Sequence, residues 1–381
     1  MAAPLVETSD VLILGAGPAG LSAAAGLARL LHTAVVFSTA RFRNERARHM
    51  HAVPGWDHGD PAAFRAATRA QLLARYATVR FEDREIVRVS KIAAAATGPP
   101  LFEAVGADGA AFRGRRVVVA SGVRDVMPPD IPGFAELWGY SIFHCLFCHG
   151  FEERGRPSAG LLVTGPMANP TMAPAVARMA GRLADRVTVY TNGDAEFGAA
   201  MRELLKSTTK YRIEDRKIVS LAKDPDSTPV ATPFTTTTTS AAMKQDNTSS
   251  SSSASHGLLV TLEDGTVTRE AFLAHAPATE QAGPFAAQLG LELEPQGGGG
   301  FIKVAAPFPA TSVEGVFAAG DCATALRSVP AAMYMGATAA AGVVHSLEAE
   351  DDVREEGGGA GGQRDGLKKN GMKVVLASIG S

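Results

Sequence analysis

The sequence predicts an α/β protein of two domains, each a three-layer arrangement with helices on both sides of a parallel sheet. Residues 10–26 form a strand, a glycine-rich turn and a helix in succession, and a second strand–helix pattern begins at Gly160. Both strands are continuous apolar runs, as in parallel strands that are covered on both faces. The 381 residues are enough for two domains of ordinary size.

The composition limits the partners and the location that we expect. Hydrophobic residues make up 46% and charged residues 20%, and the net charge of −2 favours neither nucleic acid nor an anionic membrane. Three cysteines cannot build a secreted disulfide framework, and the acids Glu7 and Asp10 do not fit a secretory signal. The longest mostly apolar stretch, 331–344, is too short to span a bilayer. We therefore expect a cytoplasmic protein.

The first strand–turn–helix unit has the pattern of a dinucleotide site. The strand 11–14 ends in the turn Gly15-Ala16-Gly17-Pro18-Ala19-Gly20, the helix runs through Leu27, and the next strand is 34–37. Gly15 permits the tight turn, Gly17 lets a pyrophosphate approach the backbone, and Gly20 lets the helix pack on the strand. The helix N-terminus supplies free N–H groups and a favourable dipole. This context predicts a Rossmann-like, nucleotide-binding fold.

Later segments extend this unit. An acid normally ends the second strand and holds the ribose, but Ser38 stands there, so Ser38 replaces it or the ribose is held otherwise. The buried strand 117–120 ends at Gly122, and the strand 315–319 ends in Gly320-Asp321, which by itself indicates only a turn with an N-capping Asp. A helix from 330 to about 347 follows.

The second unit has a strand at 160–164, a helix at about 174–183 and a strand at 187–190. We expect residues 124–276 to form this second domain, and residues 1–123 and 277–350 the first. Residues 224–256 contain unbroken Thr and Ser runs and predict a disordered low-complexity insertion, and 351–381 a flexible tail.

The pair Cys145 and Cys148 stands in C-x-x-C spacing, which predicts a redox centre that cycles between dithiol and disulfide. The alternatives are a zinc half-site and a chance pair of buried cysteines. His144 and His149 flank the pair too closely to complete a usual zinc tetrahedron. Their imidazoles can instead lower a thiol pKa or move protons.

A histidine-rich loop, with His49, His51 and His58, follows Arg43-Asn44. Three histidines raise the possibility of a metal site, but no Cys, Asp or Glu stands at a strong ligand spacing. We therefore expect no metal, and a loop that packs near the bound cofactor.

Taken together, these segments resemble the low-molecular-weight thioredoxin reductase family of flavoproteins over nearly the whole chain. The matching segments are 15–22, 120–122 with 131–134, 145–151 and 311–321. The resemblance implies two Rossmann-like domains, a homodimer, and FAD held by the first and last segments, with Gly320 and Asp321 at its ribityl and phosphate part. The expected FAD-binding residues are Gly15, Gly17, Pro18, Ala19, Gly20, Ser38, Arg43, Asn44, His51, Gly122, Gly320 and Asp321.

The departures from that family lie in the second domain. His149 replaces the acid that follows the second cysteine, and Gly165 stands alone where three glycines are needed. Two prolines remove N–H donors from the same turn, and no arginine cluster follows Tyr190. We therefore expect a degenerate NADPH-binding fold.

With these departures, the chain resembles the fungal dithiol oxidases of the gliotoxin and epipolythiodioxopiperazine type. The matching segments are 43–44, 49–51, 55–58, 145–150, 320–322 and 335–337. The resemblance implies a small-molecule dithiol substrate and O₂ as electron acceptor, giving H₂O₂. Substrate would attack Cys145, and Cys148 would pass electrons to FAD. His149, with His144, would exchange protons near neutral pH. An NAD(P)H-dependent disulfide reductase and a non-catalytic flavin redox sensor remain alternatives.

Overall fold

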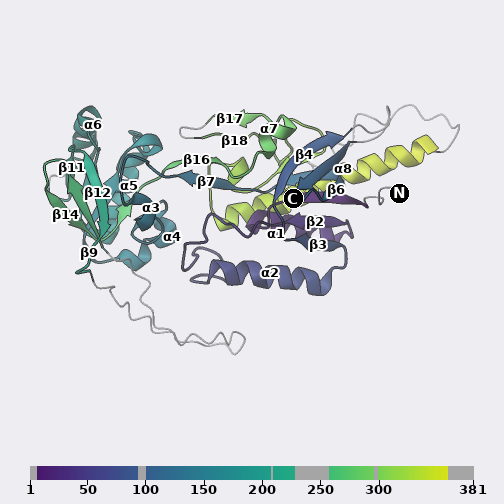
Figure 1. The fold of residues 1–381 in the computed structure, drawn as a ribbon, viewed down its shortest axis with the longest axis horizontal. Helices are drawn as coiled ribbons and strands as arrows, with labels where there is room; N and C mark the ends of the chain where they lie inside the picture. The colour runs from purple at the N-terminus through teal and green to yellow at the C-terminus, as the bar shows by residue number, and fades with distance from the viewer. Residues whose placement is uncertain (1–6, 93–99, 207–208, 228–256, 296–298, 359–381) are drawn as a thin grey trace, which may run out of the picture.

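The computed structural model describes residues 7–92, 100–206, 209–227, 257–295 and 299–358. Its two main sheets lie one after the other along the long axis, each with its own helices (Figure 1). Two short antiparallel strands, β7 (Val123–Val126) and β16 (Ala278–Gln281), connect them. The predicted domain boundaries, 123/124 and 276/277, fall at this connection and stay a prediction.

The first sheet has the order β3-β2-β1-β6-β5-β4, with β19 also paired to β6. Strands β3, β2, β1, β6 and β19 are parallel, and β5 and β4 extend the sheet in antiparallel fashion. The strands are β1 (Thr8–Leu14), β2 (Ala34–Phe37), β3 (Val79–Glu82), β4 (Ile86–Ile92), β5 (Leu101–Gly106), β6 (Ala111–Val119) and β19 (Val316–Ala318). The helices and small strands around it are α1 (Pro18–Arg29), α2 (Pro61–Arg75), α7 (Phe285–Leu289), β17 (Leu293–Glu294), β18 (Phe301–Ile302), η3 (Asp321–Ala323) and α8 (Val329–Gly358).

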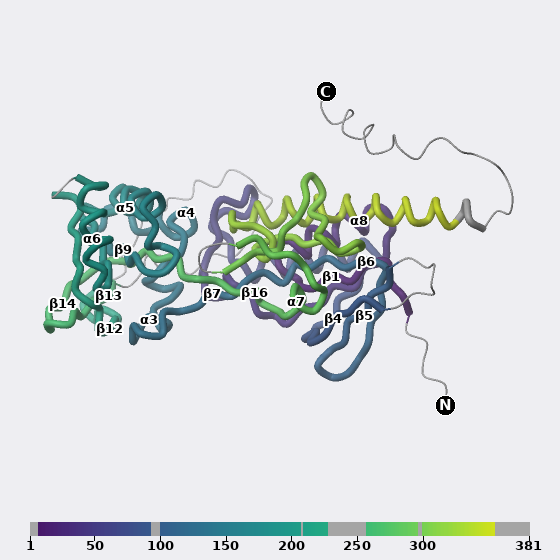
Figure 2. The backbone as a smooth tube through the Cα atoms, turned by 90° about the horizontal axis from the view of Figure 1, so that it is seen from above, coloured from purple at the N-terminus to yellow at the C-terminus, as the bar shows by residue number. Residues whose placement is uncertain are grey.

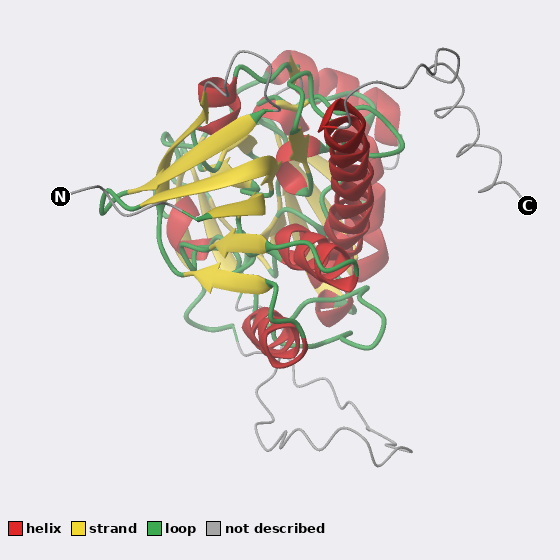
Figure 3. Ribbon diagram, turned by 90° about the vertical axis from the view of Figure 1, so that its right-hand side faces the viewer, coloured by secondary structure: helices red, strands yellow, loops and turns green. Residues whose placement is uncertain are grey.

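Strand β1 has a separate core on each of its faces. Val11 and Ile13 pack with α1 and α8 on one face, while Leu12 and Leu14 pack with Phe102 and its neighbours on the other. The continuous apolar run therefore has the physical cause that the sequence predicted, burial of both faces of a parallel strand. In Figure 3, α8 lies along one side of this sheet.

The second sheet repeats the parallel pattern in the order β11-β10-β9-β15-β8. Leu161 packs on one face of β9 and Leu162 on the other. The elements are α3 (Phe134–Leu137), β8 (Ile142–Phe143), α4 (Leu146–His149), η1 (Phe151–Glu153), β9 (Arg156–Leu162), η2 (Gly165–Met167), α5 (Met172–Leu183), β10 (Ala184–Tyr190), α6 (Ala195–Leu205), β11 (Tyr211–Glu214), β12 (Ile218–Lys223), β13 (Leu258–Leu262), β14 (Val267–Glu270) and β15 (Leu273–Ala274). Strands β12, β13 and β14 form a separate antiparallel sheet. The predicted α/β class is confirmed.

Helix α8 is longer than predicted. It continues past 347 to Gly358 and projects beyond the sheet (Figure 2). Arg115 and Arg116 of β6 donate hydrogen bonds to the Glu350 carboxylate at 2.8 and 2.7 Å. These bonds hold the start of the added part of the helix against β6. Of the predicted insertion 224–256, residues 224–227 are described and the rest lie outside the described residues; of the predicted tail 351–381, residues 351–358 belong to α8 and the rest lie outside the described residues. Within the described residues, no helix is both long and apolar enough to cross a membrane.

Candidate functional site

The predicted glycine turn leaves the N-terminus of α1 open. A Cβ on Gly15 (φ +123°) would lie 2.3 Å from the Ala120 carbonyl oxygen, and one on Gly20 would lie 1.9 Å from the Gly15 oxygen. At Gly17 nothing lies within 4 Å of the Cβ position. The helix has no side-chain cap and no acid in its first turn, and Pro18 is its first residue. A pyrophosphate therefore fits here against the helix N-terminus.

The strand β19 brings Gly320 and Asp321 to this turn. A Cβ on Gly320 (φ +83°) would lie 2.9 Å from the Ala19 Cβ, so the two predicted FAD segments are in contact. The Arg43 guanidinium donates to Asp321 Oδ2 at 3.0 Å and to Asp125 Oδ1 at 2.7 Å. Burial alone would lower the pKa of Arg43, but these two carboxylates raise it above its usual value. Asp321 is thus a partner of Arg43, and Asp125 was missed by the sequence analysis.

The remaining predicted FAD residues are held by other contacts. Ser38 is buried at the end of β2, and its Oγ accepts from the Ala40 N–H at 3.1 Å. Asn44 Oδ1 accepts from Arg65 Nη1 at 3.0 Å. Gly122, at φ +74°, follows β6 with nothing within 4 Å of its Cβ position. The FAD contacts of these three residues stay predictions.

The cysteine pair forms a disulfide at the start of the short helix α4. The Cα atoms of Cys145 and Cys148 are 5.3 Å apart, and both residues are half-buried. Phe147 between them is 78% exposed. The third cysteine, Cys322, is buried in the first domain, and burial raises the pKa of its thiol to about 11. The pair therefore has the bond of a redox centre, while Cys322 is a protonated core side chain.

The two flanking histidines require a correction to the predicted proton chemistry. Burial, with the charge of Arg43, lowers the pKa of His144 to about 4, and burial, with nearby His51, lowers the pKa of His149 to about 4. The His149 ring stacks on Phe143 at 4.9 Å. Both imidazoles are thus neutral at pH 7, and the expectation that they titrate near neutral pH is wrong for the disulfide form. A neutral imidazole can still accept a thiol proton, because a new thiolate beside it raises its pKa.

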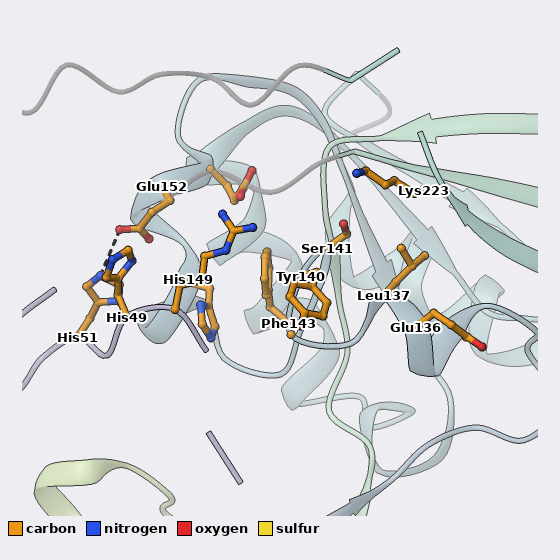
Figure 4. Close-up of a pocket in the computed structure, with 13 residues that line it drawn as sticks. His49, His51, Glu136, Leu137, Tyr140, Ser141, Phe143, His149, Glu152 and Lys223 are labelled. Atoms are coloured by element: carbon orange, nitrogen blue, oxygen red, sulfur yellow. Dashed lines mark ion pairs between the residues drawn. The ribbon is translucent and has the colours of Figure 1, made fainter. Parts of the chain in front are cut away.

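The histidine loop packs against the cysteine helix. His51 Nδ1 lies 2.6 Å from the Cys148 carbonyl oxygen, and His51 Nε2 lies 3.3 Å from Glu152 Oε1. His49 and His51 line a cavity of about 260 Å³, together with Tyr140, Phe143, His149 and Glu152 (Figure 4). Neither cysteine lines it. His51 thus contacts α4, the helix that carries Cys148, and its predicted contact with FAD stays a prediction.

The corresponding N-terminus in the second domain, that of α5, is closed by its own chain. Asn169 Oδ1 accepts from the N–H groups of Thr171 and Met172 at 2.9 and 3.0 Å, and the Asn169 carbonyl accepts from the Ala173 N–H at 2.9 Å. Pro166 lies in the preceding turn, η2. The N–H groups that are left free at the N-terminus of α1 therefore have counterparts at α5 that already donate to Asn169.

Comparison with known proteins places the chain in a family. The model of the pyridine nucleotide-disulphide oxidoreductase family matches residues 9–220. Thioredoxin reductase aclD of Aspergillus oryzae is 40% identical over 93% of this chain and 100% of its own, and thioredoxin reductase tcpT of Claviceps purpurea is 40% identical over 86% and 90%.

Among solved structures, the oxidoreductase from Agrobacterium tumefaciens has a TM-score of 0.71 at 26% identity, over 90% of this chain and 99% of its own. The predicted resemblance, the two Rossmann-like domains and FAD as cofactor are thereby confirmed. The chain therefore belongs to the pyridine nucleotide-disulphide oxidoreductase family, as a thioredoxin reductase-like oxidoreductase that binds FAD.

Proposed function

We propose that this protein is an FAD-dependent dithiol oxidase that forms a disulfide in a small-molecule dithiol and reduces O₂ to H₂O₂. The observation that carries the proposal is the contrast between its two nucleotide-type turns. The N-terminus of α1 is open, whereas Asn169 occupies the N–H groups of α5. A nicotinamide cofactor lacks its usual phosphate cradle, so the dithiol itself is the electron donor.

The first chemical step is thiol–disulfide exchange. A substrate thiolate attacks Sγ of Cys145, the Cys145–Cys148 bond breaks, and Cys148 leaves as a thiolate. The second substrate thiolate then attacks the substrate sulfur of the mixed disulfide and expels the Cys145 thiolate. The substrate has lost two electrons and two protons, and the protein pair has gained the electrons. The choice of Cys145 as the attacked sulfur rests on the family resemblance.

In this proposal, His149 takes a proton in this step. It is neutral in the disulfide form and directly follows Cys148, so it can accept a proton from an incoming thiol. The turn 15–20 and Gly320-Asp321 would hold FAD, which would supply the two-electron acceptor for the reduced cysteine pair and the route from it to O₂. From the resemblance to the fungal dithiol oxidases, we propose a secondary-metabolite dithiol of epidithiodioxopiperazine type as substrate. The proposal includes a cytoplasmic homodimer.

Anaerobic rapid mixing tests the proposal. The oxidised protein is mixed with dithiothreitol in one experiment and with NADPH or NADH in another, and the flavin absorbance is followed. We expect the dithiol to bleach the flavin and the nicotinamides to leave it oxidised. Rapid bleaching by NADPH or NADH would establish the reductase alternative. Bleaching by the dithiol without subsequent reoxidation by O₂ would establish the redox-sensor alternative.

A further inference from the structure

Three side-chain atoms of the kind that bind metals lie close together beside α4, and they come from two segments that are far apart in the sequence. His51 and His58 belong to the loop between β2 and α2, and Glu152 belongs to η1, directly after α4. His51 Nε2 lies 3.0 Å from His58 Nδ1 and 3.3 Å from Glu152 Oε1, and His58 Nδ1 lies 3.9 Å from the same oxygen. The sequence analysis expected no metal because it found no acid at ligand spacing. The fold brings that acid from a distant segment.

The hydrogen bond made by His51 decides which of its two ring nitrogens has a free lone pair. Its Nδ1 lies 2.6 Å from the Cys148 carbonyl oxygen, which can only accept a hydrogen bond. The Nδ1 therefore carries a proton, and in the neutral ring Nε2 is bare. That lone pair faces the Glu152 carboxylate at 3.3 Å. Two lone-pair donors at this distance require a proton or a metal cation between them.

The spacing of the three atoms fits a tetrahedral zinc ion. Zinc–nitrogen and zinc–oxygen bonds are about 2.0–2.1 Å, which places tetrahedral ligand atoms about 3.4 Å apart. The observed separations of 3.0, 3.3 and 3.9 Å lie on both sides of that value. Two histidines and one glutamate form a common set for zinc sites that keep a fourth position open.

We propose that His51, His58 and Glu152 form a Zn²⁺ site with its fourth position beside the cavity. The hydrogen bond from His51 Nδ1 to the Cys148 carbonyl is the outer contact that usually orients a metal-binding histidine. His49 stacks on the His58 ring at 4.0 Å and holds it in place. The ion joins the histidine loop to the segment that carries the redox pair, and the backbone of Cys148 is one hydrogen bond away from it.

Zinc binding by the oxidised, untagged, FAD-loaded protein tests this site, and the test does not depend on the proposed dithiol oxidase activity. After treatment with a chelator and its removal, Zn²⁺ is titrated by calorimetry in competition with a chromophoric chelator. The disulfide form is used because the cysteine thiolates are then unable to bind zinc. Glu152→Gln and His58→Ala are compared with two matched controls. Glu136→Gln removes an exposed carboxylate of the same cavity, and His345→Ala removes an exposed histidine elsewhere.

We expect one Zn²⁺ per chain for the unchanged protein and for both controls. Loss of an outer contact typically weakens metal binding about 10–100-fold. Loss of a direct ligand should cost more, so we expect each ligand variant to bind zinc about 100-fold more weakly or worse. Far-UV circular dichroism and flavin content show whether the variants fold, and Glu152→Gln keeps the shape of the buried side chain. Two results would overturn the proposal. One is no zinc binding by the unchanged protein at micromolar concentrations, and the other is equal binding by Glu152→Gln, His58→Ala and the controls.

Discussion

Arg43 should contribute strongly to stability, because it joins two distant carboxylates to the loop that precedes α2. Its guanidinium donates three hydrogen bonds of 2.7–3.2 Å to Asp125 and one of 3.0 Å to Asp321. The Arg43 side chain is 17% exposed and that of Asp125 only 5%. The variant Arg43→Met keeps the unbranched apolar stem of the side chain but removes its charge and every donor.

The expected cost follows from the burial of Asp125. Without Arg43 its carboxylate loses this cation in a nearly water-free place, and breaking a buried ion pair typically costs about 3–5 kcal/mol. Whole domains are stable by only about 5–15 kcal/mol, so this loss is a large fraction. FAD binding should weaken as well, because the same guanidinium holds Asp321 beside the glycine turn.

Urea denaturation followed by circular dichroism and by flavin release measures the effect. The matched control is Arg41→Met, whose ion pair with Glu85 is exposed, with side-chain exposures of 69% and 54%, and should contribute only about 0–1 kcal/mol. In the double variant Arg43→Met with Asp125→Asn, the loss should be smaller than the sum of the two single losses. If Arg43→Met loses no more stability than Arg41→Met, the account of this network is wrong.

Three further predictions concern the turn, the histidine and the cysteines. Gly20→Ala should cost about 1–3 kcal/mol or more and yield a colourless protein, because the new Cβ would lie 1.9 Å from the Gly15 oxygen; absorbance and FAD content check it. Burial first lowers the pKa of His149 from 6.5 to about 4, so the unfolded chain binds more protons between these pH values and the unfolding free energy falls as pH drops through them. His149→Gln should remove part of that slope in urea denaturation at pH 7 and pH 5, and should slow dithiol oxidation about 10²–10⁴-fold. Cys145→Ser and Cys148→Ser should each reduce oxygen uptake with a dithiol to background, and only Cys148→Ser, which keeps Cys145, should accumulate a mixed disulfide with an oxidised substrate, visible by mass spectrometry.

The local elements were predictable because their causes lie within short segments. The strand 34–37 has the predicted limits, since all four residues of this apolar run are buried in the sheet. The glycine turn follows from the steric demands of Gly15 and Gly20 on their immediate surroundings. Helix α8 was predicted too short, because the ion pairs of Glu350 come from β6, far away in the sequence.

The candidate site was predictable only in part, because several of its interactions are long-range. The C-x-x-C spacing was sufficient to find the redox pair. The partners of Arg43 come from β7 and from η3 after β19, and Glu152 reaches His51 from η1; all are far from their partners in the sequence, and no local pattern encodes these contacts. One local signal was available: Glu152 stands three residues after His149, about one helical turn away. The pKa values of the histidines depend on burial and could not be obtained from spacing.

Oxygen consumption in the absence of any nicotinamide tests the central claim most directly. The purified, FAD-loaded protein is given a small dithiol in air-saturated buffer, and O₂ uptake, H₂O₂ formation and substrate disulfide are measured together. We predict one O₂ consumed and one H₂O₂ formed for each substrate disulfide, over many turnovers, with no change on adding NADPH. Absence of O₂ uptake until NADPH is added, with net reduction of disulfides instead of their formation, would contradict the proposal.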